Sequence, residues 1–152
     1  MKKIIFLLLL VTLSALPILA GPIRVSFRDS TILRGKTVYI PVWIDSSTTG
    51  LNIKSYELDI NYTSSNMIID SVISTGSMTA SWQAPAFHLY SGRITVASAG
   101  TNVLDGTGVL VFLRLKLPLD GSGTYGYLQF TKAYFNEGAP STITRNGTIT
   151  IT

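Results

Sequence analysis

The segment Ser55-Tyr56-Glu57-Leu58-Asp59-Ile60-Asn61-Tyr62 decides the fold class, because polar and apolar side chains alternate along it without a break. Successive side chains of a β-strand point to opposite faces of the sheet, so this alternation predicts a strand that is buried on one face only. The buried face would carry Tyr56, Leu58, Ile60 and Tyr62. The solvated face would carry Ser55, Glu57, Asp59 and Asn61. A strand with one solvent-exposed face is typical of an antiparallel sheet.

The same period of two recurs on both sides of this segment, interrupted about every ten residues by Gly, Asn, Asp, Ser or Pro. The pattern predicts nine strands: residues 23–28, 37–44, 53–62, 67–73, 87–90, 93–98, 109–117, 125–130 and 143–152. Helical periodicity is nearly absent. Nine short strands joined by short connections predict an all-β fold, a nine-stranded antiparallel β-sandwich with jelly-roll topology. Trp82 follows a loop of small residues, and we expect it to close one end of the core.

The first twenty residues have the pattern of a secretory signal peptide. Lys2 and Lys3 precede the apolar run Ile4–Leu10, and a small residue, Ala20, stands before Gly21. Cleavage after Ala20 would release residues 21–152 as a single domain, secreted to an extracellular location. The ten basic and eight acidic residues that then remain leave a charge of +2 and form no dense basic stripe, so nucleic acid is not an expected partner.

Catalytic chemistry finds little support in the sequence. The 152 residues include no cysteine, which excludes thiol catalysis, disulfides and cysteine-ligated metals. The one histidine, His88, lies in a predicted strand without a nucleophile motif beside it. Glu57 and Asp59 would lie about 6–7 Å apart, between the usual carboxylate spacings of retaining and inverting glycosidases, but such a pair on an alternating strand is more often simply a solvated face. We therefore predict that the protein is not an enzyme.

No metal site is predicted, because the acidic residues are scattered and form no calcium-binding loop. A calcium site assembled from distant segments stays an open alternative. Two triplets, Asn61-Tyr62-Thr63 and Asn146-Gly147-Thr148, match the glycosylation sequence, although so short a match is common by chance.

The order of several segments resembles that of a cohesin domain, the receptor module of cellulosome scaffold proteins. The similar segments are residues 35–44, 56–62, 92–100, 106–110 with 113–115, and 135–138. The resemblance extends from about residue 23 to residue 152, and related carbohydrate-binding modules share much of the same strand pattern.

This resemblance implies a nine-stranded jelly roll without enzymatic activity that binds a dockerin, a small module with two calcium ions of its own. No cofactor is therefore expected in this chain, since the calcium would belong to the partner. The dockerin would cover the third, fifth, sixth and eighth predicted strands. The partner-binding residues would be Ser55, Glu57, Asp59, Asn61, Thr95, Ala97, Ala99 and Thr101, with Ser98 as the alternative to Ala99 if the register of its strand slips.

Two other functions stay open. A carbohydrate-binding module could use the aromatic pair Tyr39 and Trp43, which lie four residues apart on one face of a predicted strand, to bind polysaccharide. A surface-assembly subunit could instead pair with copies of itself through its sheet edges.

Overall fold

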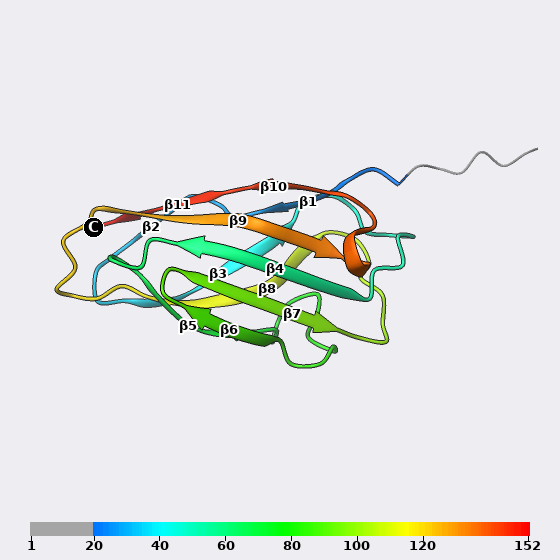
Figure 1. Ribbon diagram of the computed structural model, residues 1–152, viewed down its shortest axis with the longest axis horizontal. Helices are drawn as coiled ribbons and strands as arrows, with labels where there is room; N and C mark the ends of the chain where they lie inside the picture. The colour runs from blue at the N-terminus through cyan, green and yellow to red at the C-terminus, as the bar shows by residue number, and fades with distance from the viewer. Residues whose placement is uncertain (1–19) are drawn as a thin grey trace, which may run out of the picture.

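The computed structural model describes residues 20–152, which form two β-sheets packed face to face (Figure 1). The predicted signal peptide, residues 1–20, lies outside the described residues except for Ala20. No helix among residues 20–152 has the length and apolar character needed to cross a lipid bilayer. The fold is thus an all-β sandwich of two layers, as the alternating sequence predicts.

The two sheets have five and six strands. The order in the first is β10 (Thr142–Arg145), β1 (Ile23–Ser26), β3 (Thr37–Ile44), β8 (Gly108–Lys116) and β5 (Ile68–Ile73). The order in the second is β2 (Ser30–Ile32), β11 (Gly147–Ile151), β9 (Tyr125–Phe135), β4 (Ser55–Tyr62), β7 (Arg93–Ala99) and β6 (Ala86–Tyr90). A short 3-10 turn, η1 (Asn136–Gly138), follows β9.

The predicted number and direction of the strands need correction for the first two and the last two strands of residues 20–152. Residues 20–152 form eleven strands, and two pairs are parallel, β1 with β10 and β2 with β11. The single strand predicted over residues 143–152 is interrupted at Asn146, where the chain leaves one sheet and joins the other. Strand β2 escaped prediction because three residues are too few to display a period of two. The jelly-roll topology stays a prediction.

Strand β9 is longer than predicted because it contains a β-bulge. Its pairing with β4 shifts between Asp59 and Ile60, which are opposite Lys132 and Phe130, so Thr131 is an extra residue. The bulge reverses the alternation, and as a result both Gln129 and Lys132 lie on the outer face. The interrupted alternation explains why the prediction ended this strand at Phe130.

The core lies between the sheets and consists of the inward side chains that alternation predicts. Leu58 and Ile60 of β4 are fully buried, while Tyr62 at the end of the strand is half-buried. Trp82 closes one end of the core as expected, because its ring stacks on Tyr56 with centroids 6.1 Å apart. Its indole N–H donates to the carbonyl of Asn102 at 2.8 Å, which fixes the loop after β7.

Candidate functional site

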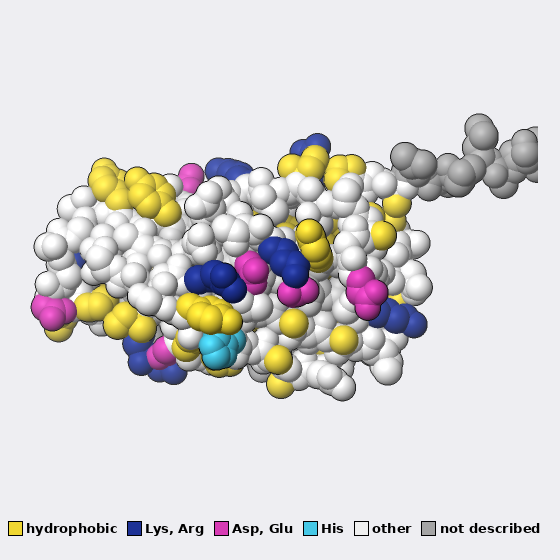
Figure 2. All heavy atoms as spheres, in the orientation of Figure 1, with side chains coloured by type: hydrophobic (Ala, Val, Ile, Leu, Met, Phe, Trp, Pro, Cys, Tyr) yellow, Lys and Arg dark blue, Asp and Glu magenta, His cyan; other side chains and the backbone are white. Residues whose placement is uncertain are grey.

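The outer side of β4, β7 and β6, together with the part of β9 from Lys132 to its end, forms one continuous surface, which we call the docking face (Figures 1 and 2). These four neighbours are the strands that the resemblance implies for partner binding. The register places Ser55 of β4 opposite Ala99 of β7. Three more cross-strand pairs follow along the same two strands: Glu57 with Ala97, Asp59 with Thr95, and Asn61 with Arg93. Seven of the eight predicted partner-binding residues therefore share one face of the sheet.

The register of β7 continues without a slip to its end. Ser98 points inward and is buried, and its hydroxyl donates to the carbonyl of Gln83 at 2.7 Å. Ala99 is the exposed residue. The eighth predicted residue, Thr101, lies just beyond the strand in an exposed loop, at the same end of the docking face.

The docking face is open to solvent. The Glu57 side chain is 45% exposed, and its neighbours Ser55, Asp59, Thr95 and Ala97 are half-buried by their cross-strand partners. Figure 2 shows the acidic and basic side chains at the surface in the middle of this face. The loops within residues 20–152 therefore leave the solvated face of β4 accessible to another molecule.

Lys132 and Tyr134 belong to this face although the sequence did not reveal them. The Lys132 ammonium bonds the Glu57 carboxylate at 2.6 Å and lies 4.9 Å from the centroid of the Tyr134 ring. The hydrogen bond to Glu57, aided by the charges of Glu57 and Asp59, raises the pKa of Lys132. A second alternating segment, Lys132 to Phe135, begins after the irregularity at Thr131. Treating it as a continuation of the strand would have placed Lys132 and Tyr134 on the outer face.

Asp59 and Thr95 carry unmet hydrogen-bonding capacity in the middle of the face. One carboxylate oxygen of Asp59 and the hydroxyl of Thr95 are buried and have no hydrogen-bond partner within residues 20–152. Buried polar groups are normally paired, so this cross-strand pair is a point where a partner or an ordered water could complete the surface.

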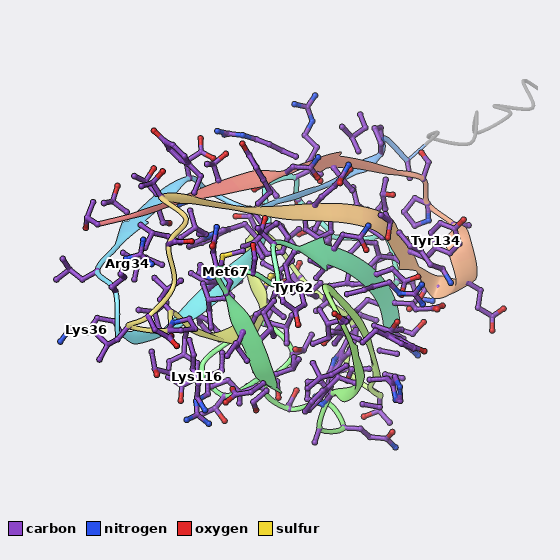
Figure 3. All side chains as sticks on the ribbon, turned by 60° about the vertical axis from the view of Figure 1, so that its left-hand side comes forward. Arg34, Lys36, Tyr62, Met67, Lys116 and Tyr134 are labelled. Carbon is purple, nitrogen blue, oxygen red and sulfur yellow. The ribbon has the colours of Figure 1, made fainter. Side chains whose placement is uncertain are left out.

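Beside these polar groups lies a hollow of about 330 Å³ between β4, β7 and η1. Ala97 and Ala99 contribute small side chains to its lining, and Glu57, Tyr134 and Glu137 are among the large residues there. Figure 3 shows Tyr134 near the end of β9, close to the turn that follows it. An adjoining hollow of about 340 Å³ includes Ala99 and Thr101. Small residues beside larger polar ones form a surface that can receive protruding side chains of a second polypeptide.

His88 and the acidic pair show no catalytic arrangement. Every residue of β6 is exposed, and the His88 ring packs against Tyr90 with centroids 4.5 Å apart. Phe87 and Leu89 pack only partly, each about two-fifths exposed at this sheet edge. Glu57 is engaged by Lys132. Among residues 20–152, no group of three or more His, Cys, Asp or Glu side chains could hold a metal ion.

The aromatic pair of the carbohydrate alternative lies on the other sheet and forms no flat platform. Tyr39 is 52% exposed, but Trp43 is half-buried under the guanidinium of Arg28, which lies 3.7 Å from the centroid of its ring. A sugar could stack on that face of Trp43 only after displacing Arg28, which also pairs with Asp45.

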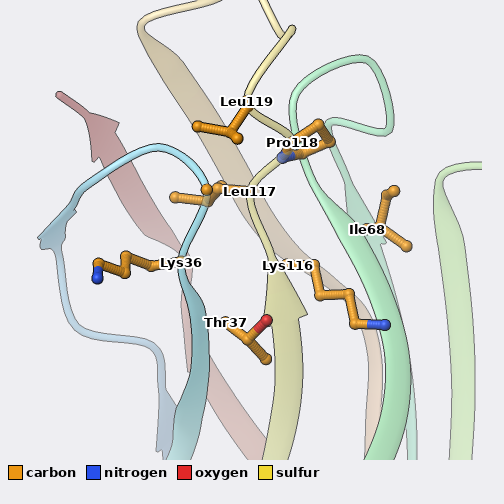
Figure 4. A pocket seen from close by; sticks show the side chains of 8 residues that line it. Lys36, Thr37, Ile68, Lys116, Leu117, Pro118 and Leu119 are labelled. Carbon is orange, nitrogen blue, oxygen red and sulfur yellow. The ribbon is translucent and has the colours of Figure 1, made fainter.

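The five-stranded sheet has a hollow of its own, shown in Figure 4. It measures about 320 Å³ and is lined mainly by apolar groups at the ends of β3, β5 and β8. Leu119 is 79% exposed beside it, and Lys116 is paired with Asp70 at 2.5 Å. This hollow lies apart from the docking face.

Comparison with known proteins identifies the fold. No family model matches the chain, and none of the curated proteins does. Solved structures do match it across most of its length. The cohesin of a Coh-OlpA–Doc918 cohesin–dockerin complex from Clostridium thermocellum has a TM-score of 0.72 at 14% identity, covering 87% of this chain and 100% of the other.

Two further structures give the same result. A non-cellulosomal cohesin from the archaeon Archaeoglobus fulgidus has a TM-score of 0.70 at 16% identity, with coverage of 87% and 92%. The cohesin CaCohA2 from Clostridium acetobutylicum has a TM-score of 0.70 at 17% identity, with coverage of 86% and 91%. Residues 20–152 therefore have the cohesin fold.

Proposed function

We propose that this protein is a non-catalytic cohesin module that binds a dockerin-bearing protein through its docking face. The observation that carries the proposal is the open side of β4 and β7, where Ser55, Glu57, Asp59, Asn61, Thr95, Ala97 and Ala99 lie in register. The cohesin fold supports it, since one matching structure is a complex between a cohesin and a dockerin.

The docking face has the physical properties that such a contact requires. From Thr95 to Ala99 its outward residues on β7 are small, so an α-helix can approach the sheet closely there and rest across the strands. A stable contact buries about 1,200–2,000 Å² in total. Four neighbouring strands and the loop that holds Thr101 offer a surface of that order.

The polar residues would set the orientation of the partner. Glu57 is held by Lys132, so its free carboxylate oxygen is presented in a fixed position to hydrogen-bond donors of the dockerin. Ser55 and Asn61, at the two ends of β4, would hydrogen-bond the partner at the margins. Rim contacts of this kind favour specificity more than affinity.

Three related features belong to the same proposal. The protein would be exported by its signal peptide and act outside the cell. The calcium of the complex would be held by the dockerin rather than by this chain. The sandwich would correspond to the jelly roll of cohesins, with the ends of the chain divided between the two sheets.

The direct test is binding to a panel of calcium-loaded dockerins, measured by biolayer interferometry with wild type and two variants. Glu57→Arg should weaken binding about 30-fold or more, because it reverses a charge that becomes desolvated in the complex. Tyr39→Ala, an exposed change on the opposite sheet, should leave binding within twofold of wild type. The proposal fails if no dockerin binds, or if both variants weaken binding equally.

A further inference from the structure

A second surface lies at the end of the six-stranded sheet opposite Ala99, around the first residues of β9. Tyr125 and Tyr127 point outward there with 55% and 60% of their surface exposed. They are two residues apart on one face, so their rings project from points about 7 Å apart. Large exposed aromatic groups that lie together are unusual on a monomeric protein and often mark a binding surface.

Tyr127 lies between two hollows. On one side is a hollow of about 250 Å³, lined by Asn61, Tyr62, Thr63, Tyr127 and Gln129. On the other is a hollow of about 280 Å³, lined by Tyr127, Leu128, Gln129, Asn146, Gly147 and Thr148. No charged residue lines either hollow. Side-chain amides, hydroxyls and the two tyrosines Tyr62 and Tyr127 make up almost the whole lining.

The charged residues next to these hollows are engaged by other groups of the protein. Asp29 pairs with Arg145 and accepts the backbone N–H of Thr148. Arg93, across from Asn61, lies over the ring of Tyr90 at 4.6 Å. In Figure 2, charged side chains gather over the middle of this side of the molecule, whereas white and yellow surfaces dominate its left-hand end, where β9 begins. The ligand that matches this surface is therefore uncharged.

The surface is held in shape before any ligand arrives. Thr63 makes two hydrogen bonds to the backbone of Tyr127. The Thr63 hydroxyl oxygen accepts the Tyr127 N–H at 3.0 Å, and the Thr63 N–H donates to the Tyr127 carbonyl at 3.3 Å. The side-chain oxygen of Asn146 accepts the N–H of Phe130 at 3.0 Å, which fixes the orientation of the remaining amide N–H₂. Groups fixed in this way lose little conformational entropy when they bind.

From these observations we infer a binding site for neutral saccharides, centred on Tyr127 and separate from the docking face's small-residue end. A tyrosine ring offers an apolar face on which the C–H side of a sugar ring can stack. Side-chain amides both donate and accept hydrogen bonds, which matches the hydroxyl groups of a sugar. Asn61 and Gln129 on one side and Asn146 on the other would contact sugar units adjacent to the stacked one. Tyr125 would contact a further sugar unit of the bound polysaccharide on one side of Tyr127.

Affinity gel electrophoresis of the protein in hydroxyethyl cellulose, xylan and galactomannan tests this site, with polygalacturonate as an acidic polysaccharide. At least one neutral polymer should retard wild type, and Tyr127→Ala should weaken that retardation about tenfold in apparent affinity. Tyr39→Ala removes a tyrosine of similar exposure from the other sheet and should retain wild-type retardation. Thermal unfolding of each variant checks that the exposed substitutions leave the fold intact.

Three results would overturn the site: no retardation by any neutral polymer, equal weakening by Tyr127→Ala and Tyr39→Ala, or stronger retardation by polygalacturonate than by the neutral polymers. A dockerin-binding measurement on Tyr127→Ala separates this proposal from the docking function. Loss of polysaccharide retardation with unchanged dockerin binding would support two sites on one sheet that meet at Asn61, a marginal residue of the docking face.

Discussion

Gly100→Ala should destabilise the end of the docking face by filling space that Trp82 occupies. A Cβ atom added at Gly100 would lie 2.3 Å from the indole ring of Trp82, so the ring must move. Overpacking of this kind costs about 1–3 kcal/mol. Displacing the ring also strains its 2.8 Å hydrogen bond to the carbonyl of Asn102, a contact that contributes about 0.5–1.5 kcal/mol. The expected loss in free energy of unfolding is therefore about 2–4 kcal/mol.

Urea unfolding followed by tryptophan fluorescence measures this loss, and thermal unfolding should show a midpoint about 6–12 °C lower. Gly21→Ala is the matched control, since a Cβ atom added at Gly21 meets nothing within 4 Å. It should leave stability within about 0.5 kcal/mol of wild type. If Gly100→Ala is as stable as Gly21→Ala, the packing of Trp82 over Gly100 cannot be as described.

Three other changes test separate parts of the fold and the site. Leu58→Ala, in the fully buried centre of β4, should lower the free energy of unfolding by about 2–5 kcal/mol in urea, and a loss below 1 kcal/mol would contradict the core assignment. Asn136→Ala removes two 2.9 Å hydrogen bonds to the loop before β4 and should lower the free energy of unfolding by about 1–2 kcal/mol. Hydrogen exchange of the Lys54 amide should become faster in this variant, and an unchanged exchange rate would count against the contact. Glu57 raises the pKa of Lys132 above the usual 10.5, so the pair stabilises the folded state below pH 10.5 and ceases to do so as the pH rises through the raised pKa. The stability advantage of wild type over Lys132→Met should therefore decline at high pH, and an advantage that grows with pH would refute the pairing.

Local alternation was sufficient to predict most of the strands and the direction of their side chains. The predicted bounds of residues 37–44 coincide with β3, and Glu57 and Asp59 lie on the solvated side of β4 as expected. The prediction was less complete where a strand contains an irregularity. Thr131 shifts the alternation of β9 by one residue, so Lys132 and Tyr134 were not assigned to the outer face.

The placement of the candidate site on one sheet face was predicted more completely than the topology, while its role in binding stays a prediction. Its residues follow from which face of each strand is polar, and that property is encoded within a few neighbouring residues. The alternative site at Tyr39 and Trp43 depended on a distant residue, because Arg28 covers Trp43 from another segment. The surface around Tyr127 likewise requires Asn61 and Asn146, which alternation does not connect.

The sequence by itself determined that residues 23–152 form a two-layered β-sandwich and which side of β4 faces water. Only the tertiary structure decided that β1 lies parallel to β10 and β2 to β11, and that Lys132 reaches Glu57 across 75 residues of chain. The physical reason is the separation along the chain of the residues that interact. Side-chain alternation is a local property of each strand, whereas strand partners and register are settled when both sheets bury their apolar faces against each other.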